Sequence, residues 1–475
     1  MRNFSLLTDL YELTMGQGYF NEGIHEREAA FDLFFRPNDL ISYSVAAGME
    51  EACSYLENLR FDKDDIAYLS SLHLFTDEFL QYLKNFQFHG TVRAVREGEI
   101  VFPGEPILTV CAPLFEAQIV ETALLTLINH ETLIATKASK IVREAKGDPV
   151  MEFGLRRAQG ADAGVYGARA ALIAGCSSTS NVYAGKQFSI PVSGTMAHSW
   201  VMNFPSELEA FEAYARAFPD DCLLLVDTYN TLESGVPNAI QVFNRLKKEG
   251  HKPKGIRIDS GDLAYLSKEA RKMLDKAGFE SAIICASGDL DEYTIRSLKE
   301  QGAKINSWGV GTKLITSASL PSLGGVYKLA AVFEDGKEIP KLKLSDTEAK
   351  TTNPAYKEVY RVYDKESGFA LFDYIARAGE KVSEEGEISL DGSRKKYKNF
   401  RLKKLLQPMF TAGKRVLPSY SVADGRGYCE AELARFREEY KRLDMPHIYR
   451  VHLSPTLAKL KKEMIEKIEE ENGGV

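Results

Sequence analysis

The sequence has few cysteines, and their spacing suggests neither a metal site nor a disulfide framework. Its six cysteines are scattered singly through 475 residues, and no Cys-x-x-Cys pair occurs. Zinc ribbons and disulfide-stapled domains need clustered cysteines, so neither class is indicated. Several of the six lie in apolar runs, which predicts reduced and buried thiols.

Long apolar runs and an excess of positive charge are also missing. No apolar run approaches the roughly 18 residues of a membrane-spanning helix, and the N-terminus, MRNFSLLTDLYEL, lacks the apolar core of a signal peptide. We therefore expect a cytoplasmic protein with no membrane partner. The net charge is -7. Because phosphate backbones require a basic face, no nucleic-acid partner is expected.

The hydrophobic pattern changes near residues 147 and 335, which predicts three segments. Residues 1–146 mix helices with extended stretches, as in an α+β domain, and residues 335–475 are strand-rich and then helical. Residues 147–334 alternate strands with helices. The helices expected outside this middle segment cover residues 5–20, 48–59, 63–71, 76–85, 114–146, 428–443 and 454–471.

The middle segment predicts repeated βα units. Its strand-like runs cover residues 149–153, 188–192, 222–226, 255–258, 282–286 and 305–310. The helical stretches between them cover residues 206–218, 236–249, 263–277 and 290–301. Repeated βα units form a parallel sheet, which leaves an open doubly wound sheet and an irregular α/β barrel as alternatives.

Each of these strand-like runs is followed by polar and glycine residues. The clusters lie at residues 152–157, 193–198, 227–231, 257–262, 287–289 and 309–312. One such cluster is an ordinary turn or cap. Six in succession favour the functional rim of a barrel, where catalytic groups from several strands meet.

His198 is the most reactive group among these clusters. It is one of eight histidines, and it follows a run through Phe188, Ile190 and Val192 that indicates a buried strand. No Gly-x-Ser-x-Gly elbow is present, so a hydrolase triad is not indicated. A histidine beside phosphate-binding turns can act as a general acid or base, or can accept a phosphoryl group.

The other clusters are typical of a site for a phosphorylated anion. Arg156, Arg157 and Arg257 suit carboxylate or phosphate, although pairing with acidic neighbours remains an alternative. Backbone N–H groups at Gly309-Val310-Gly311-Thr312 suit phosphate, as does the small-residue turn Ser287-Gly288. Neither a P-loop nor a dinucleotide fingerprint is matched. The carboxylates suited to Mg²⁺ are those of Asp227, Asp259 and Asp262.

Three other features have ordinary structural interpretations. The basic segment 393–404 is typical of a hairpin edge guarded by lysines. Ser5 is expected to cap the first helix, and Tyr11 on that helix favours a core position. Ser454-Pro455 has the residue types of an N-cap and first helical position.

In combination, the motifs resemble those of the nicotinate phosphoribosyltransferase family. The resemblance runs from about residue 5 to residues 350–354, and more loosely to the end. The residues that carry it are Thr8-Asp9-Leu10-Tyr11, Glu152-Phe153-Gly154-x-Arg156-Arg157, Ser193-Gly194-Thr195-x-x-His198, Asp227-Thr228-Tyr229, Arg257-x-Asp259-Ser260-Gly261-Asp262, Gly309-x-Gly311-Thr312 and Gly324-Gly325-Val326-Tyr327-Lys328.

This resemblance implies a fold and a reaction. The fold is an irregular, incomplete α/β barrel beside an α+β domain built from both chain ends. The family makes nicotinate mononucleotide and pyrophosphate from nicotinate and 5-phosphoribosyl 1-pyrophosphate, coupled to ATP hydrolysis, in NAD biosynthesis and salvage. ATP as co-substrate, Mg²⁺ as cofactor and a homodimer with shared active sites are implied as well.

The resemblance also implies a role for each motif. ATP would phosphorylate His198, while Tyr11 of the partner subunit would stack on nicotinate. Thr195 and Arg257 would contact nicotinate, Thr312 and its turn would bind the 5′-phosphate, and Asp259 and Asp262 would lie near the magnesium pyrophosphate. The remaining expected substrate contacts are Arg156, Arg157, Ser287, Gly288, Gly309 and Gly311.

Other functions remain as alternatives. A nicotinamide phosphoribosyltransferase would share these motifs, and adjacent Arg156 and Arg157 favour the acid only mildly. A quinolinate enzyme would be shorter and independent of ATP. A catalytically dead dimeric protein would bind the metabolite without turnover. A Schiff-base aldolase barrel would use one of the lysines Lys137, Lys140 and Lys186.

Overall fold

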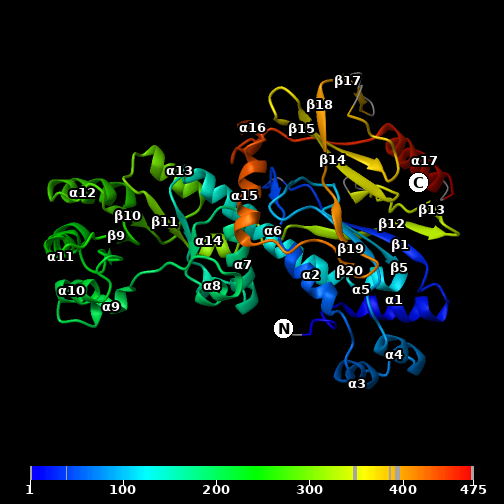
Figure 1. The fold of residues 1–475 in the computed structure, drawn as a ribbon, viewed down its shortest axis with the longest axis horizontal. Helices are drawn as coiled ribbons and strands as arrows, with labels where there is room; N and C mark the ends of the chain where they lie inside the picture. Colours follow the sequence, from blue (N-terminus) through cyan, green and yellow to red (C-terminus); the bar gives the residue numbers. More distant parts are fainter. Residues whose placement is uncertain (1–2, 39, 346–349, 385–386, 391–395, 472–475) are drawn as a thin grey trace. The chain divides into compact units, whose positions relative to one another are not determined.

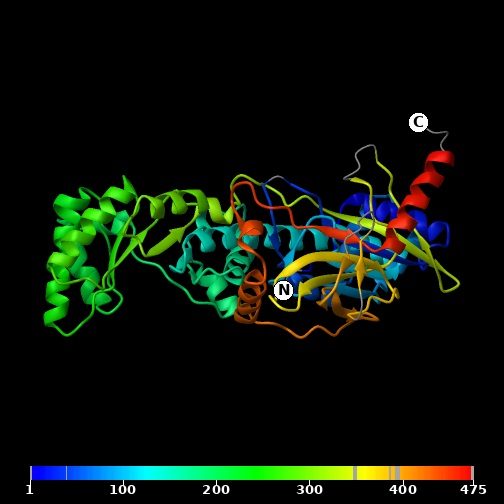
Figure 2. The same ribbon diagram turned by 90° about the horizontal axis from the view of Figure 1, so that it is seen from above.

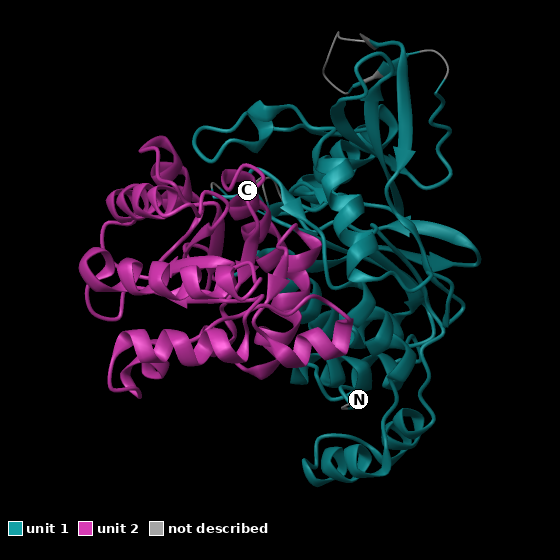
Figure 3. Cartoon of the chain, turned by 60° about the vertical axis from the view of Figure 1, so that its left-hand side comes forward, with its two compact units in different colours: residues 1–133, 322–475 teal, residues 134–321 magenta. Residues whose placement is uncertain are grey.

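The computed structural model describes residues 3–38, 40–345, 350–384, 387–390 and 396–471. The chain separates into two compact units, residues 134–321 and residues 1–133 with 322–475 (Figure 3). The first boundary falls inside helix α6, Glu121–Glu144. In the sequence, the hydrophobic pattern changes only near the end of α6. The boundary expected from that pattern, between residues 146 and 147, therefore lies later than the boundary in the structure.

The unit of residues 134–321 is built on a six-stranded parallel sheet in the order β7-β6-β11-β10-β9-β8 (Figure 1). Its strands are β6 (Val150–Glu152), β7 (Ser178–Thr179), β8 (Leu223–Leu225), β9 (Gly255–Ile258), β10 (Ile283–Ala286) and β11 (Ser307–Val310). Among the described residues, β7 and β8 have no ladder between them, so the sheet stays open. The expected irregular, incomplete α/β barrel is confirmed.

The helices that follow these strands are amphipathic, and their apolar sides are buried. On α11 the buried residues include Ala239, Val242, Phe243 and Leu246, which share one face at a spacing of three and four. The helices of this unit are α7 (Ala161–Ile173), α8 (Val182–Phe188), α9 (His198–Met202), α10 (Glu207–Ala217), α11 (Val236–Lys248), α12 (Leu263–Lys276), α13 (Glu292–Glu300) and α14 (Thr312–Ile315). The four helices expected from the sequence are confirmed.

The expected strand at 188–192 is wrong. Phe188 is the last residue of α8, and Val192 contributes only an isolated parallel bridge to Thr179. The strand at this position of the sheet is instead the two-residue β7. Ile190 is buried but Val192 is half exposed. The apolar alternation therefore belongs to a loop in which Ile190 is buried more completely than Val192.

The unit of residues 1–133 and 322–475 contains a seven-stranded sheet in the order β13-β12-β1-β5-β3-β19-β20. Its strands are β1 (Glu28–Phe35), β3 (Thr91–Ala94), β5 (Leu108–Pro113), β12 (Gly325–Glu334), β13 (Lys337–Pro340), β19 (Gln407–Thr411) and β20 (Lys414–Arg415). Residue Ala29 of β1 pairs with Ala112 of β5 and with Val332 of β12. Strand β12 therefore completes this sheet, although its sequence lies in the expected 147–334 segment.

The same unit has a four-stranded sheet in the order β18-β14-β15-β21, and Figure 2 shows the ribbon of the chain from above. Its strands are β14 (Lys357–Asp364), β15 (Ala370–Arg377), β18 (Phe400–Lys404) and β21 (Val451–Leu453). Two short pairs join β2 (Ser44–Val45) with β4 (Ile100–Val101), and β16 (Ile388–Ser389) with β17 (Lys396–Tyr397). Both chain ends contribute strands and helices to this unit, as the α+β expectation requires.

The helices of this unit are α1 (Leu10–Asn21), α2 (Met49–Asn58), α3 (Lys63–Ser71), α4 (Asp77–Lys84), α5 (Leu114–Ile119), α15 (Val422–Leu433), α16 (Glu438–Lys441) and α17 (Pro455–Glu471). Helices α2 to α5 and α17 begin within one residue of the expected positions, whereas the helix expected at 5–20 begins only at Leu10 and the one expected at 114–146 is divided into α5 and α6. The N–H of Leu457 donates to Ser454 Oγ at 3.1 Å, which confirms the cap of α17. The expected helix 428–443 is wrong in extent, because a capping box at Ser421 and Asp424 starts α15 earlier.

Two expectations for the first helix are wrong. The N-cap of α1 is Asp9, and the Ser5 hydroxyl is buried and donates to the Arg60 carbonyl at 2.7 Å. Tyr11 is 43% exposed, and Leu10 and Met15 are exposed beside it. Tyr11 is therefore no core residue, and α1 presents an apolar side that this unit does not cover.

The described part of the basic segment 393–404 forms the edge strand β18, as expected, while residues 391–395 lie outside the described residues. Its lysines do more than guard the edge, because Lys403 contacts Glu99 at 2.7 Å and Glu432 at 2.9 Å. None of the described helices is both long and apolar enough to cross a membrane.

Candidate active site

A cavity of about 500 Å³ lies at the carboxyl ends of the parallel strands. The residues expected from the sequence that line it are Arg156, Arg157, Thr195, His198, Arg257, Asp259, Ser287, Gly288, Gly309, Gly311 and Thr312. They come from strand ends and from the loop after α8. Convergence of polar side chains from several strands in one cavity is the arrangement of a catalytic site.

Three expected residues do not line this cavity: Asp227, Asp262 and Tyr11. Asp262 does not line the cavity; it is the N-cap of α12, and its Oδ1 accepts the N–H of Tyr265 at 2.9 Å. Tyr11 belongs to the other unit. The sequence motif Asp-Ser-Gly-Asp does not distinguish a ligand carboxylate from a helix cap, because both uses favour aspartate at a strand-to-helix turn.

Glu152 shapes the first strand end without entering the cavity. Its side chain is fully buried, accepts the Thr179 hydroxyl at 2.6 Å and also accepts the backbone N–H of Gly154. Burial raises the pKa of Glu152 above its ordinary value, and these two donors oppose that rise. The carboxylate thus joins β6 to β7 and fixes the turn that presents Arg156 and Arg157, both exposed.

Two glycines at the strand ends are required by close approach of neighbouring atoms. A Cβ on Gly309 would lie 2.6 Å from the Phe153 ring. Gly288 has a φ of 107°, and a Cβ there would lie 2.6 Å from the Asp259 carbonyl. Any side chain at either position would displace a residue that lines the cavity, so both glycines keep the floor open.

Arg257 presents its guanidinium to the cavity from β9. Its Nη1 donates to Thr195 Oγ1 at 2.9 Å, while its Nε is buried with no hydrogen-bond partner. A buried N–H without an acceptor costs free energy. Because Arg257 lines the cavity, its guanidinium is a candidate group for binding an anion beside Thr195.

His198 is positioned from its Nδ1 side. It is the first residue of α9, and Nδ1 lies 3.1 Å from Thr228 Oγ1 at the end of β8. Because one ring nitrogen is occupied by this hydrogen bond, Nε2 is the nitrogen left for chemistry. Thr228 was present in the sequence motif 227–231, but nothing in its spacing predicted that it would orient the histidine.

Asp259 and Asp227 are linked in a polar network. The Asp259 carboxylate accepts the Ser287 hydroxyl, and Asp227 Oδ2 accepts the Asp259 backbone N–H at 2.9 Å. Asp227 Oδ1 is buried and has no hydrogen-bond partner. Asp259 lines the cavity and Asp227 does not, so Asp259 is the carboxylate of this pair that faces a bound ligand, and carboxylate oxygen is the ligand type that a hard divalent cation prefers.

The turn at Thr312 is anchored from the start of α13. Lys313 Nζ contacts Asp291 Oδ2 at 2.9 Å. Burial alone would raise the pKa of Asp291, but Lys313 and the Thr294 donors lower it below its ordinary value. The aspartate therefore stays charged and fixes Lys313, so that the preceding Gly311 and Thr312 face the cavity.

Six residues that line the cavity were absent from the expected substrate contacts: Phe153, Ser180, Gly194, Met196, Ala197 and Asp289. Ser180 follows β7, the strand that the sequence pattern displaced to 188–192. Met196 and Ala197 lie inside the recognised motif and contribute between its polar members. Phe153, directly after β6, and Asp289, after Ser287 and Gly288, also lie in clusters that the sequence had marked, so Ser180 is the one residue of the six without such a signal.

The lysines of the aldolase alternative do not line this cavity. Lys137 is buried and contacts Glu292 at 2.7 Å, and Lys186 is exposed on α8. Burial lowers the pKa of Lys140 to about 8. A Schiff-base lysine must reach the substrate carbonyl, so the described geometry does not favour that chemistry.

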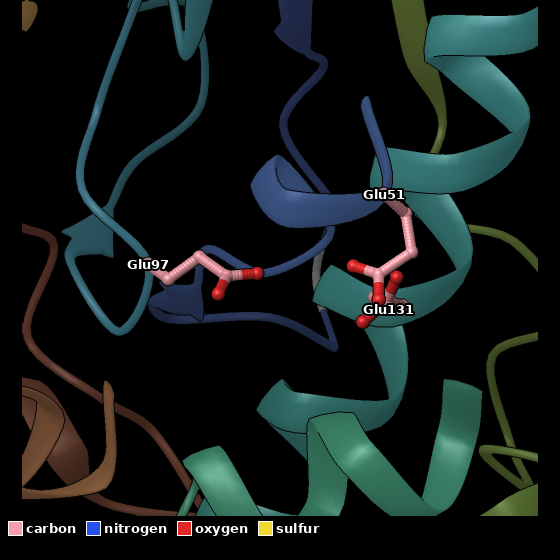
Figure 4. A group of neighbouring side chains, drawn as sticks. All are labelled: Glu51, Glu97 and Glu131. Atoms are coloured by element: carbon pink, nitrogen blue, oxygen red, sulfur yellow. The ribbon is translucent and has the colours of Figure 1, made fainter. Parts of the chain in front are cut away.

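Another acidic group lies in the other unit. Glu51, Glu97 and Glu131 bring one carboxylate oxygen each within 4.8 Å of one another (Figure 4). Glu97 Oε1 accepts the backbone N–H groups of Gly48 and Met49 at 3.0 and 3.1 Å, where α2 begins. This carboxylate has a capping function, because helix N-termini expose donors that anions satisfy.

Three family models match the chain over most of its length. The model of the nicotinate phosphoribosyltransferase (NAPRTase) N-terminal domain matches residues 6–129, and the NAPRTase family model matches residues 149–367. The model of the nicotinate phosphoribosyltransferase C-terminal domain matches residues 356–461.

Curated relatives and solved structures agree with these models. The nicotinate phosphoribosyltransferase of Bacillus subtilis is 46% identical over 98% of this chain and 96% of its own. That of Caenorhabditis elegans is 39% identical over 78% of this chain and 76% of its own. The crystal structure of human nicotinic acid phosphoribosyltransferase superposes with a TM-score of 0.85 at 31% identity, covering 96% of this chain and 99% of that chain.

Proposed function

This chain belongs to the nicotinate phosphoribosyltransferase family, and we propose that the cavity of residues 134–321 joins nicotinate to 5-phosphoribosyl 1-pyrophosphate, with ATP hydrolysis coupled through His198. The products are nicotinate mononucleotide and pyrophosphate, and the reaction serves NAD biosynthesis. The observation that carries the proposal is the presence in one cavity of the Arg257–Thr195 pair, His198 and the turn at Gly311-Thr312.

Arg257 and Thr195 bind nicotinate. The carboxylate of nicotinate pairs with the Arg257 guanidinium, which lines the cavity beside Thr195. The Thr195 hydroxyl accepts from Arg257 Nη1 at 2.9 Å and donates to the Met196 carbonyl at 3.3 Å, so Thr195 would donate to nicotinate by exchanging this long backbone contact for the substrate. A neutral carboxamide would not balance the guanidinium charge, which favours nicotinate over nicotinamide.

The phosphoribosyl group lies on the small-residue turns. Backbone N–H groups at Gly311 and Thr312 bind the 5′-phosphate, as expected for a turn that leaves a strand and starts a helix. Ser287 and Gly288 provide the second turn. Arg156 and Arg157 are exposed at the cavity wall and supply positive charge toward the pyrophosphate.

The carboxylates fit a magnesium pyrophosphate. Asp259 lines the cavity, so a hard oxygen ligand is present. Mg²⁺ held by Asp259 would neutralise negative charge on the leaving pyrophosphate. Asp262 uses Oδ1 to cap α12, which leaves Oδ2 as the atom it would offer to the metal.

The chain orients the reactants for a displacement at the anomeric carbon. The ring nitrogen of nicotinate forms a bond to C1 of the ribose as the C1–O bond to pyrophosphate breaks, and pyrophosphate leaves with the bonding electrons. Arg257 and Thr195 fix the ring at one end, and the turn at Thr312 fixes the ribose phosphate at the other. Holding both reactants in one geometry lowers the barrier by removing their translational freedom.

ATP phosphorylates His198 in the coupled step. Nδ1 bonds to Thr228 Oγ1 at 3.1 Å, and the lone pair of Nε2 attacks the γ-phosphorus as the bond to the ADP oxygen breaks. The phosphoryl group brings negative charge and acceptor oxygens to the loop of Thr195. Hydrolysis of the phosphohistidine after turnover returns the free imidazole and inorganic phosphate.

Tyr11 completes the site from a second subunit of a cytoplasmic homodimer. Its ring is 43% exposed at the start of α1, which leaves it available to stack on nicotinate bound by the partner. In the proposed homodimer, each subunit would supply this ring to the cavity of the other.

One coupled assay tests the proposed reaction. The full chain is incubated with nicotinate and 5-phosphoribosyl 1-pyrophosphate, with and without ATP, and nicotinate mononucleotide is measured by chromatography. We expect turnover in both cases and faster turnover with ATP. Nicotinamide in place of nicotinate should give a far lower rate. Substrate binding without any product would favour the catalytically dead alternative instead.

A mixing experiment tests the shared site. Tyr11→Ala and His198→Ala are purified separately, each expected to be slow, and then dissociated and reassociated together. If each site takes Tyr11 from one subunit and His198 from the other, mixed dimers regain one intact site, and about a quarter of wild-type activity returns. No recovery above the separate variants would refute the exchange.

A further inference from the structure

A second large cavity lies in the unit of residues 1–133 and 322–475, and none of the residues that line it takes part in the proposed reaction. Its volume is about 430 Å³, close to that of the candidate active site, at about 500 Å³. Cavities of this size enclose small organic ligands in proteins. All of its walls come from the C-terminal part of the chain, between Ala370 and His452.

The walls of this cavity are lined by flat rings. Phe372 of β15 lies 4.6 Å from Tyr397 and 5.4 Å from His452 of β21, measured between ring centroids. Tyr440 of α16 lies 5.3 Å from His447. These rings come from the sheet on one side and from the helix and its following loop on the other, so a planar ligand would meet ring faces and edges.

The charge of the cavity is complementary to an anion. Arg437 and Arg450 both line it, whereas Glu439 is the one carboxylate among the described lining residues. Both arginines are exposed, and the Arg437 guanidinium lies 5.6 Å from the Phe369 ring. Guanidinium groups prefer planar oxyanions such as carboxylate and phosphate. The lining therefore combines ring surfaces with two cationic forks at its edge.

We propose that this cavity is a second binding site, specific for a nucleoside monophosphate. The base lies against the rings of Tyr397 and Tyr440, with buried Phe372 behind Tyr397, and the phosphate lies on Arg437 and Arg450. Glu439 accepts a hydroxyl of the ribose. A neutral aromatic compound would leave both guanidinium groups unused, and inorganic phosphate would leave the rings unused, so the ligand must carry both groups.

Photolabelling of the full-length protein tests this proposal. The probe is 8-azido-AMP, and the labelled peptides are mapped by mass spectrometry after proteolysis. We expect label on peptides that contain residues 437–452 or Tyr397, suppressed by excess unmodified AMP and not by excess inorganic phosphate at equal concentration. Label confined to peptides that contain His198 or Arg257 would overturn the proposal.

Matched variants make the result specific. Arg450→Gln and Arg437→Gln should each weaken labelling at this site by about tenfold, the effect of removing one charge-assisted hydrogen bond. Arg442→Gln changes an exposed arginine of the same loop that does not line the cavity, and should label as wild type does. Because all three side chains are exposed, folding should be unaffected. Equal labelling of all three variants would overturn the proposal.

Discussion

Removing the guanidinium of Arg257 should convert an enzyme selective for the acid into one that treats acid and amide alike. Arg257 Nη1 is fixed by Thr195 Oγ1 at 2.9 Å, and Nε is buried without a partner. The variant Arg257→Gln keeps a polar side chain but removes the charge and the fork. The nicotinate carboxylate should then have no cation to pair with, whereas nicotinamide carries no charge that needs one.

The size of the effect follows from the energy of one hydrogen bond between charged groups. Such a bond contributes about 1.5–3 kcal/mol, which corresponds to a factor of about 10–150 in binding. We therefore expect kcat/KM for nicotinate to fall by that factor in Arg257→Gln. For nicotinamide, kcat/KM should change by less than about tenfold, since removing a neutral hydrogen bond costs about 0.5–1.5 kcal/mol.

The assay is a steady-state comparison of both bases at saturating 5-phosphoribosyl 1-pyrophosphate. Arg157→Gln, which changes an exposed arginine of the same cavity, serves as the matched control and should retain the preference for acid over amide. If Arg257→Gln slows both bases equally, the guanidinium stabilises the site as a whole. In that case the assignment of Arg257 to the nicotinate carboxylate is wrong.

Other substitutions should act on single features of the structure. Thr228→Val removes the hydroxyl that lies 3.1 Å from His198 Nδ1. The stimulation by ATP, measured as the ratio of rates with and without ATP, should fall about tenfold. Unchanged stimulation would refute the role of Thr228. Burial raises the pKa of Glu12 from 4.5 to about 7, so the folded state binds that proton more tightly than the unfolded state does. As the pH rises from 4.5 to 7, the free energy of unfolding of the wild type should therefore fall by up to about 3 kcal/mol. Urea unfolding of Glu12→Gln should lack this slope. In the wild type, the buried carboxylate of Asp373 lies 2.6 Å from the Arg361 guanidinium. Arg361→Met removes this counter-charge, and the free energy of unfolding should fall by about 3–5 kcal/mol. Adding Asp373→Leu should recover part of that decrease.

Most of the site was predictable because strand ends and turn chemistry are local. The residues after β6, β9, β10 and β11 carry arginine, aspartate, serine and glycine directly behind apolar runs, and these runs are the strands of the sheet. Parallel strands bring their carboxyl ends to one edge, so neighbouring clusters converge without any further information. The cavity lined by Arg257, Asp259 and Gly309 is the result.

The errors arose where the decisive partner is distant in sequence. Ile190 and Val192 alternate as in a strand, yet the strand that pairs with β6 is Ser178–Thr179. The Thr179 hydroxyl donates to the Glu152 carboxylate and so holds this strand beside β6. Tyr11 is an aromatic residue on an apolar helix face, and only the packing of the whole unit shows that no described element of it covers this ring. Asp262 caps α12 because it is the residue directly before the first turn of that helix. The hydrophobic pattern gives the start of a helix only approximately, so this role could not be separated from that of a metal ligand.

The insertion of residues 134–321 into the other unit has a consequence for synthesis on the ribosome. Strands β1, β3 and β5 emerge early and pair with one another, but the outer edge of β1 waits for β12 and that of β3 waits for β19. At usual elongation rates the roughly 200 residues between β5 and β12 take about 10–40 s to translate. During that interval the inserted unit can fold from contiguous sequence, while the nascent three-stranded sheet exposes two unpaired edges. The step most exposed to chaperone binding and aggregation is therefore the pairing of β12 and β19 with the early strands in the unit of residues 1–133 and 322–475. The folding of residues 134–321 is less exposed.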